Sequence, residues 1–186
     1  MADSGVIEAG RLRLVPFAEE HLTERYLGWL RDQALLRFSE QRFRRHTLAS
    51  CREYRASFQG SPNHFWAVEE TGQGLGHVGT MTAYVDERNG VADLGILLGA
   101  AEARGRGLAL EAWQAACRFL LARGVRKITA GALSVNAAML RVMEKAGMVP
   151  DGVRRGQVLF EGRAVDVVHM AMFAPPPASA DQQRDG

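Results

Sequence analysis

The sequence predicts one domain of the mixed α/β class, and three observations support this. The chain has 186 residues, the usual length of one domain, and 47% of them are hydrophobic, which suffices for a sizeable core. Apolar residues recur at helical spacing in some segments and alternate in others. Residues 91–135 form a strand–helix–strand unit, whose two strands are expected to be parallel with a right-handed crossover.

The first part of the chain is predicted to contain a strand, helices and a strand hairpin. Leu12 and Leu14 lie on one face of RLRLVPF (11–17), as in a half-buried strand. The expected helices are 19–38, as one helix or as two broken near Gly28 or Arg31, and 47–58, with Thr47 as the cap. The expected strands are 64–70 and 76–85, joined by the turn TGQGLG.

The second part alternates strands and helices and ends in a hairpin. The expected elements are a strand over 91–99, a helix over 107–122, a strand over 125–135, a helix over 136–147 between Asn136 and Gly147, and a hairpin of 153–160 and 164–173. Residues 174–186 are rich in Pro, Ala and polar residues, so we expect a disordered tail after a domain spanning 1–173.

Composition argues against several classes of protein. No apolar run reaches the roughly 18 residues that span a bilayer, and the N-terminus does not resemble a secretory signal, so no membrane partner is expected. Cys51 and Cys117 lie in helix-like stretches, which indicates reduced thiols in a cytoplasmic protein. No Cys/His cluster has zinc spacing, so no metal is predicted. A net charge of +2 gives no argument for nucleic acid.

Two glycine-rich stretches could bind a phosphate group. GLGHVG (74–79) matches G-x-G-x-x-G, but a strand-like segment follows it where a dinucleotide site needs a helix, so a hairpin turn is favoured. ARGRGLALEA (103–112) instead leads from a strand into a helix. Its glycines either turn the chain or let an anion approach the free N–H groups at the helix start.

This second stretch resembles the acyl-CoA pyrophosphate loop of the GNAT superfamily of N-acetyltransferases. The family pattern Gln/Arg-x-x-Gly-x-Gly/Ala is filled by Arg104, Gly107 and Ala109. A second family stretch resembles NAAMLRVMEKAGM (136–148), at Asn136, Glu144, Lys145 and Gly147. The start of the chain, from residue 11, is similar to the Rim-type branch, which includes ribosomal-protein N-terminal acetyltransferases. The resemblance covers roughly residues 11–173.

The resemblance implies a fold and a co-substrate. The fold would be a single GNAT-like domain, with helices on both faces of a mostly antiparallel sheet and a central parallel strand pair that splays apart. The pantetheine arm of acetyl-CoA would lie in that splay and pair with Ile96, Leu97 and Leu98. The groups expected to hold the co-substrate are otherwise those of Arg104, Gly105, Arg106, Gly107, Leu108, Ala109 and Asn136.

The implied reaction is direct acetyl transfer to a primary amine, which needs a base because such amines are largely protonated near pH 7. Asp93 is the first candidate, since the Rim-type branch often has a Glu near this position. An exposed strand Asp paired with an Arg is an equally open interpretation. Glu40 and His46 are the next candidates, because the segment after the first helices borders the acceptor cleft in this family.

The sequence departs from the family where many members carry a Ser and a Tyr, the latter protonating the leaving thiolate. Met139 and Met143 occupy these positions, and neither can donate a proton. Ser134, Asn136 or a water could instead stabilise the leaving thiolate. The alternative is a non-catalytic acyl-CoA-binding module.

The acceptor is expected to meet a cluster of arginines, namely Arg37, Arg42, Arg44 and Arg45. Four arginines near a cleft could hold an anionic acceptor, although such a run is usually a solvated face. Phe38, Phe43 and Trp66 could stack a ring or belong to the core. Both a protein N-terminus and a small amine such as an amino sugar stay open as acceptors, and so does a homodimer.

Overall fold

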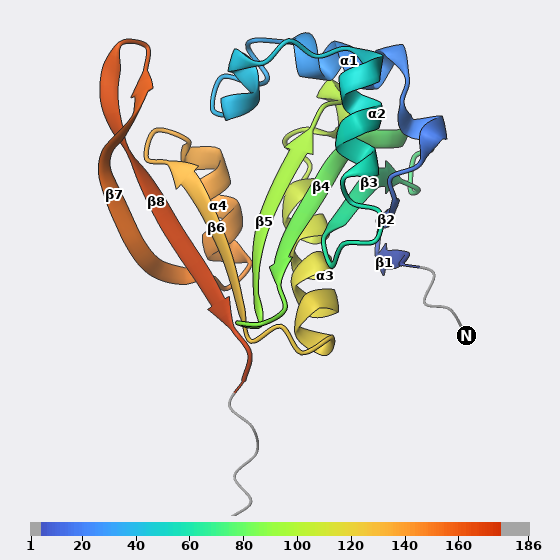
Figure 1. Ribbon diagram of the computed structural model, residues 1–186. Helices are drawn as coiled ribbons and strands as arrows, with labels where there is room; N and C mark the ends of the chain where they lie inside the picture. The colour runs from blue at the N-terminus through green and yellow to red at the C-terminus, as the bar shows by residue number, and fades with distance from the viewer. Residues whose placement is uncertain (1–4, 176–186) are drawn as a thin grey trace, which may run out of the picture.

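Eight strands form one sheet in the computed structural model, which describes residues 5–175 (Figure 1). The strands are β1 (Ile7–Ala9), β2 (Leu12–Pro16), β3 (His64–Glu70), β4 (Gly76–Asp86), β5 (Val91–Leu98), β6 (Lys127–Leu133), β7 (Val149–Phe160) and β8 (Arg163–Phe173). Their order in the sheet is β1-β2-β3-β4-β5-β6-β8-β7. Among the strands of residues 5–175, only β5 and β6 run parallel, so the predicted class and the parallel unit are confirmed.

In the described part of the chain, four α-helices cover the two faces of the sheet: α1 (Glu24–Arg31), α2 (Leu48–Ala56), α3 (Leu108–Ala122) and α4 (Ala137–Lys145). Figure 1 shows α1 and α2 on one face and α3 and α4 on the other. The predicted caps are confirmed, because Thr47 accepts a hydrogen bond from the Ser50 N–H and Asn136 accepts one from the Met139 N–H. These caps fix where α2 and α4 begin.

One layer of the core lies between α3 and the sheet. One side of α3 is apolar, and its buried residues are Leu108, Ala112, Trp113, Ala115, Ala116, Cys117 and Leu120. The strands supply the facing layer, with Leu12, Leu14 and Ile128 fully buried. Burying such side chains is the main source of stability in a domain of this size. The start of α3 is thereby fixed against the middle of the sheet.

The parallel pair separates soon after it forms. Pairing between β5 and β6 is confined to Val91–Lys127, Ala92–Ile128 and Asp93–Thr129. Beyond Asp93, β5 remains paired with β4 as far as Gly79–Leu98, while β6 remains paired with β8. Within the described residues, one edge of β5 from Leu94 onward therefore lacks a neighbouring strand, which is the splay that the resemblance implied.

The structure corrects several boundaries. The 19–38 segment ends as an α-helix at Arg31, at one of the two predicted breaks. Strand β1 was not expected, and β7 begins at Val149 instead of residue 153. Residues 71–75 connect β3 to β4 and are followed by strand, so the dinucleotide interpretation of GLGHVG is wrong and the hairpin is confirmed.

The tail predicted at 174–186 lies outside the described residues except for Ala174 and Pro175, as do residues 1–4 of the predicted domain. Within the described part, no helix is long and apolar enough to cross a membrane.

Candidate active site

The turn before α3 presents a row of backbone donors. Gly105 and Gly107 have φ angles of 73° and 78°, in the left-handed region that favours glycine. Within residues 5–175, the N–H groups from Gly105 to Leu110 have no acceptor, whereas the Glu111 N–H bonds to the Gly107 carbonyl. These donors lie at the positive end of a fifteen-residue helix. The turn is therefore able to bind an anion through its backbone.

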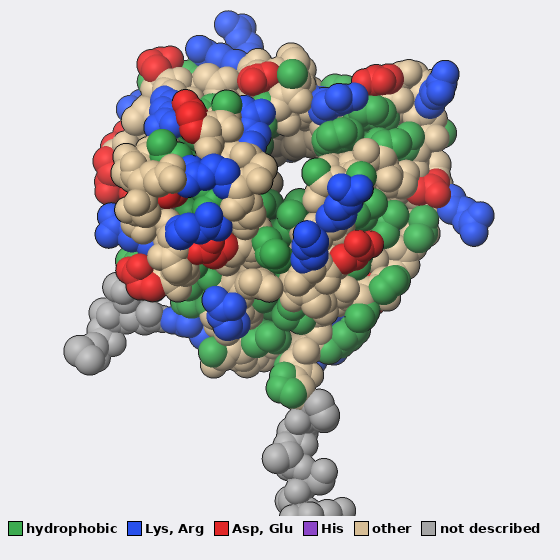
Figure 2. Space-filling view, turned by 180° about the vertical axis from the view of Figure 1, so that it is seen from behind, with side chains coloured by type: hydrophobic (Ala, Val, Ile, Leu, Met, Phe, Trp, Pro, Cys, Tyr) green, Lys and Arg blue, Asp and Glu red, His purple; other side chains and the backbone are tan. Residues whose placement is uncertain are grey.

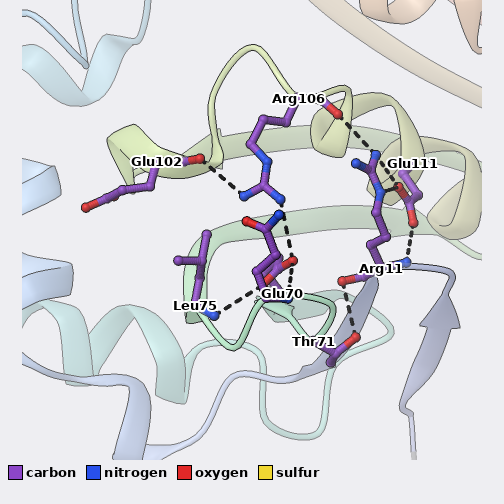
Figure 3. Close-up of polar contacts among 8 residues, drawn as sticks. Arg11, Glu70, Thr71, Leu75, Glu102, Arg106 and Glu111 are labelled. Atoms are coloured by element: carbon purple, nitrogen blue, oxygen red, sulfur yellow. Dashed lines mark hydrogen bonds and ion pairs between the residues drawn. The ribbon is translucent and has the colours of Figure 1, made fainter.

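An arginine in the turn between β1 and β2 holds this turn in place, as Figure 3 shows. The Arg11 guanidinium donates to the Glu111 carboxylate over 2.9 and 3.1 Å and to the Arg106 carbonyl over 3.0 Å. The Arg11 N–H also donates to Glu111. The Arg11 side chain thus contacts both Glu111 in the first turn of α3 and Arg106, the residue before Gly107.

The two arginines of the turn are themselves engaged by the protein. Arg104 donates to the Gly99 carbonyl over 3.3 Å, and Arg106 lies 3.4 Å from the Glu102 carbonyl and 3.8 Å from Glu70 (Figure 3). Burial raises the pKa of Glu70, but the N–H groups of Leu75 and Gln73 outweigh this and hold the pKa below its usual range. Glu70 is therefore an ionised partner for Arg106, and the backbone is left as the principal anion-binding group of the turn.

A cavity of about 400 Å³ occupies the space where β5 and β6 separate, and we call it the splay cavity. Figure 2, seen from behind, shows an opening through the molecule between its two halves. Its walls are mostly apolar, with Glu40, Ser39 and Asn136 as polar exceptions. The other lining residues are Leu35, Phe38, Leu94, Gly95, Ile96, Leu97, Trp113, Gly131, Ala132, Leu133, Met139, Val158 and Val167. Of the predicted co-substrate residues, Ile96, Leu97 and Asn136 line this cavity.

A second cavity of about 340 Å³ lies between the α1–α2 segment and strands β4 and β5, and we call it the helix-side cavity. It shares Ser39, Gly95, Ile96 and Leu97 with the splay cavity, so the two cavities meet at the free edge of β5. Its remaining lining residues are Tyr26, Leu30, Leu36, Gln41, Arg44, Arg45, His46, Ser50, Cys51, Tyr54, Phe65, Thr80, Thr82 and Tyr84, with no Asp or Glu among the described residues that line it.

Asp93 lies beside the junction of the two cavities. It pairs with Tyr84 across β4 and precedes Gly95 by two residues, so its side chain shares the face of the helix-side cavity. The Thr129 hydroxyl donates to Asp93 Oδ2 over 2.8 Å. Burial raises the pKa of the Asp93 carboxyl above its usual value, although Thr129 and His169 oppose that rise. Asp93 is exposed, as the alternative interpretation expected, but its partner is a threonine and not an arginine.

The other two candidate bases lie in different settings. His46 lines the helix-side cavity, and its Nε2 is 3.1 Å from the Gln41 carbonyl. Glu40 lines the splay cavity, but its side chain is 68% exposed and lies 3.5 Å from Arg42. His46 and Glu40 are therefore found at the walls of different cavities, whereas Asp93 lines neither cavity.

The arginine cluster divides into two parts. Arg44 and Arg45 line the helix-side cavity. Arg42 is 11% exposed and donates to the Ser39 carbonyl over 2.9 Å, so it supports the chain instead of facing a ligand. Arg37 donates to Glu161 over 2.9 Å. The structure thus brings two of the four arginines to the cavity.

The aromatic residues proposed as stacking groups do not meet in one site. Trp66 is 1% exposed and stacks on His64 at 4.8 Å within the core, so the expectation that it contacts substrate is wrong. Phe43 is 70% exposed and lies under Arg42. Phe38 stacks on Phe160 at 5.3 Å.

Sequence reasoning missed a contact between distant segments that borders the splay cavity. Phe38 and Arg37 meet Phe160 and Glu161 at the tip of the β7–β8 hairpin, and the Arg37 guanidinium also lies over both rings. We call these four residues the clasp. It also missed Arg11, Glu111 and the pair of Tyr54 and Tyr84, whose hydroxyls are 2.6 Å apart. No local pattern marks these partners, because each pair is far apart in the sequence.

The two methionines at the family's Ser and Tyr positions lie on α4. Met143 is fully buried, and Met139 lines the splay cavity. Neither side chain carries a proton to donate.

Comparison with known proteins agrees with this geometry. The model of the acetyltransferase (GNAT) domain family matches residues 11–149. No curated protein matches the chain. Among solved structures, a GNAT-family acetyltransferase from Bacillus anthracis is 20% identical, with a TM-score of 0.77, over 91% of this chain and 98% of that one.

Two further structures are similar and contain coenzyme A. RimL, a ribosomal L7/L12 alpha-N-protein acetyltransferase, is 17% identical, with a TM-score of 0.78, over 90% of this chain and 97% of that one. Spermidine N-acetyltransferase from Vibrio cholerae, in complex with CoA and spermine, is 18% identical, with a TM-score of 0.77, over 88% and 96%. With its domain match over most of the chain and the splayed strand pair, the protein belongs to the GNAT family of acetyltransferases.

Proposed function

We propose that this protein transfers the acetyl group of acetyl-CoA directly to a primary amine whose molecule also carries an anionic group. The observation that carries the proposal is the meeting of two cavities at the free edge of β5. One cavity leads along the splay, and the other has two arginines and no carboxylate in its described lining. A thioester and an amine entering from the two sides would meet beside Gly95.

The splay and the turn before α3 fit the shape and charge of acetyl-CoA. The pyrophosphate would accept hydrogen bonds from the N–H groups of residues 105–110, with the positive end of α3 beneath it. The pantetheine arm would lie along the apolar walls, and its amides would pair with the unpaired edge of β5 near Ile96. Similar structures that contain CoA support this assignment.

The charge of the helix-side cavity supports an anionic acceptor. Arg44 and Arg45 both line it, and guanidinium groups bind carboxylates and phosphates in two-point contacts. A polyamine would place several positive charges beside these arginines, and the described lining has no carboxylate to offset the repulsion. An acidic peptide N-terminus or a phosphate-bearing amino sugar would fit better than a polycation.

Asp93 is proposed as the base that prepares the amine, with His46 and Glu40 as alternatives. The protonated amine would lose its proton to Asp93, directly or through a water, and its nitrogen would attack the thioester carbonyl. The new C–N bond would form as the C–S bond breaks, the nitrogen would lose its second proton to water to give the amide, and coenzyme A would leave as thiolate. A raised carboxyl pKa makes Asp93 a stronger base than an ordinary aspartate.

Two features bear on the route and on the leaving group. Cys51 lines the helix-side cavity, but burial raises the pKa of its thiol despite Ser50 and Arg31, which argues against an acyl-cysteine intermediate. With methionines on α4, the thiolate would leave without a side-chain proton from that helix. A thiol with a pKa of about 8.5 is a tolerable leaving group near neutral pH.

The first test measures CoA release from acetyl-CoA with a panel of amines. We expect turnover with an acidic peptide N-terminus or a phosphorylated amino sugar and little turnover with spermidine. Faster turnover of spermidine than of every anionic amine would overturn the anionic acceptor. Binding of acetyl-CoA without release on any amine would favour the non-catalytic module.

The second test changes the arginines. Replacing Arg44 and Arg45 together by Ala should raise the KM for the anionic acceptor about tenfold or more, and leave acetyl-CoA affinity unchanged. The control replaces Arg118 and Arg141, which are exposed on α3 and α4 and line neither cavity, and it removes the same charge. An equal rise of KM in both variants would show that the arginines act through long-range charge and not through direct contact with the acceptor.

A further inference from the structure

Three buried side-chain polar atoms lack a hydrogen-bond partner within residues 5–175: Arg55 Nε, His169 Nε2 and Trp113 Nε1. Arg55 still donates to Glu19 through another nitrogen, and a histidine ring can leave one nitrogen deprotonated. The indole of Trp113 has a single N–H and no acceptor atom, so it has no such alternative. A buried donor of this kind is uncommon in a folded protein, and it points to an absent partner.

Trp113 lies where a ligand could supply that partner. It is 1% exposed on α3 and lines the splay cavity. Most of the wall around it is apolar, including Leu94, Leu133 and Val167, whose side chains cannot accept a hydrogen bond. None of the polar side chains of the cavity bonds to it in the structure, and an oxygen that a ligand brings into the cavity would supply the partner.

We infer that the Trp113 N–H donates to an amide carbonyl oxygen of the pantetheine arm of coenzyme A. This inference rests on the proposed binding of acetyl-CoA in the splay cavity. The arm carries carbonyl oxygens at two amides, and the acetylated form adds a third at the thioester. Trp113 is six residues beyond Gly107, so it lies about 9 Å along α3 from the anion-binding turn. That position favours an amide in the middle of the arm over the thioester at its far end.

The first experiment compares three ligands by calorimetry: acetyl-CoA, CoA and adenosine 3′-phosphate 5′-diphosphate, which lacks the arm. Trp113→Phe should weaken the binding of acetyl-CoA and of CoA alike, by about three- to tenfold, and leave the affinity for the nucleotide unchanged. Weakening of acetyl-CoA alone would assign the contact to the thioester and overturn the inference. Equal weakening of all three ligands would show that the variant merely disturbs α3.

Trp66→Phe is the matched control. Trp66 is also 1% exposed, but its N–H donates to the Gly5 carbonyl over 3.3 Å, and its ring does not line the splay cavity. The Trp66→Phe variant should bind all three ligands with the same affinity as the unchanged protein. An equal loss of CoA affinity in this control would overturn the specific role of Trp113.

The second experiment needs no change at Trp113. The chain has three tryptophans, so its NMR spectrum contains three indole N–H signals. Trp29→Phe and Trp66→Phe identify two of them, and the third is Trp113. When CoA is added, the Trp113 indole N–H signal should move downfield, and its proton should exchange more slowly with solvent. The nucleotide that lacks the arm should cause neither change.

The outcomes separate the two proposals. If the protein binds neither CoA nor the nucleotide, the proposed function fails and the inference fails with it. If CoA binds while the Trp113 signal stays in place, only the inference is overturned.

Discussion

The two sides of the connected cavities differ in the groups that they offer to a charged ligand. On the α3 side, the donors are the backbone N–H groups of residues 105–110, and Arg11 and Glu111 hold the turn that carries them. On the helix side, the charged groups are the side chains of Arg44 and Arg45, next to a short 3-10 turn over Glu40–Phe43. The cavities are of similar size, so the difference lies in the kind of donor.

This difference has a physical consequence. Backbone donors at a helix start are fixed by φ and ψ angles, so they suit one invariant group such as a pyrophosphate. Side chains on an irregular segment can change by substitution without disturbing the sheet. A fold of this kind can therefore keep one acyl donor while its acceptor varies.

The largest effect is expected at the junction of the cavities. Asp93→Asn should lower kcat about a hundredfold or more, because positioned bases contribute roughly 10²–10⁴-fold. Acetyl-CoA affinity should stay unchanged, since Asp93 lines neither the splay cavity nor the turn. Steady-state kinetics and calorimetry measure the two quantities. Full activity in this variant would move the role of base to His46, Glu40 or water.

The pH profile gives the same prediction a second readout. A base must be deprotonated, so kcat/KM should rise with pH through the pKa of Asp93, which lies above the usual carboxyl value. Thr129→Val removes a hydrogen bond that lowers this pKa. In Thr129→Val, the rise of kcat/KM on the acid side of the pH profile should therefore move to higher pH. In Asp93→Asn, that pH-dependent rise should be lost. An unmoved rise in Thr129→Val would assign it to another group.

The next effect separates the α3 side from the helix side. Gly107→Val should weaken CoA about a hundredfold, because a φ of 78° strains a β-branched residue and the side chain blocks close approach to the backbone. Gly124→Val is the control, since Gly124 has a φ of 88° just after the other end of α3. Calorimetry should show near-normal CoA affinity in the control. Equal losses in both variants would mean that strain on the helix, not ligand approach, is responsible.

The same difference explains which parts of the site the sequence could predict. The anion-binding turn depends on two glycines and a helix start within a few residues, which is a local signal. The caps at Thr47 and Asn136 are local too, and both were predicted. The brace between Arg11 and Glu111 joins residues 100 positions apart, and no spacing pattern reports it.

Two errors show the limits of periodicity. Trp66 lies on β3, where four consecutive residues are buried, so alternation could not say which face a side chain takes. Strand β1 has three residues, too few to show a period, and it forms because Gly10 turns the chain onto β2 with a φ of 60°. Tertiary packing decided both outcomes.

A smaller effect is expected from the brace of the turn. Arg11→Ala should weaken CoA about three- to tenfold, because Arg106 and Glu111 lose a shared charged partner that is itself partly exposed. Arg13→Ala is the control two residues further along the chain, since Arg13 on β2 binds Glu69 over 2.7 Å and does not touch the turn. Unchanged CoA affinity in Arg11→Ala would show that the glycine conformations alone set the geometry of the turn.

The smallest effect is expected at the clasp, which borders the splay cavity and adjoins Ser39, a residue that lines both cavities. Arg37→Ala tests it without touching the cavity arginines. The Arg37–Glu161 pair is exposed, at 49% and 69%, and such pairs contribute only about 0.2–1 kcal/mol. Its loss should loosen the segment that carries Ser39, and thereby raise the acceptor KM about two- to threefold with an unchanged CoA Kd. Glu161→Gln should have the same effect, and the double variant should add little, because both changes remove one interaction. Arg163→Ala, on the same hairpin, controls for charge. If the Kd for CoA rises as much as the KM for the acceptor, the clasp supports both cavities. The donor site and the acceptor site would then not be independent at the clasp.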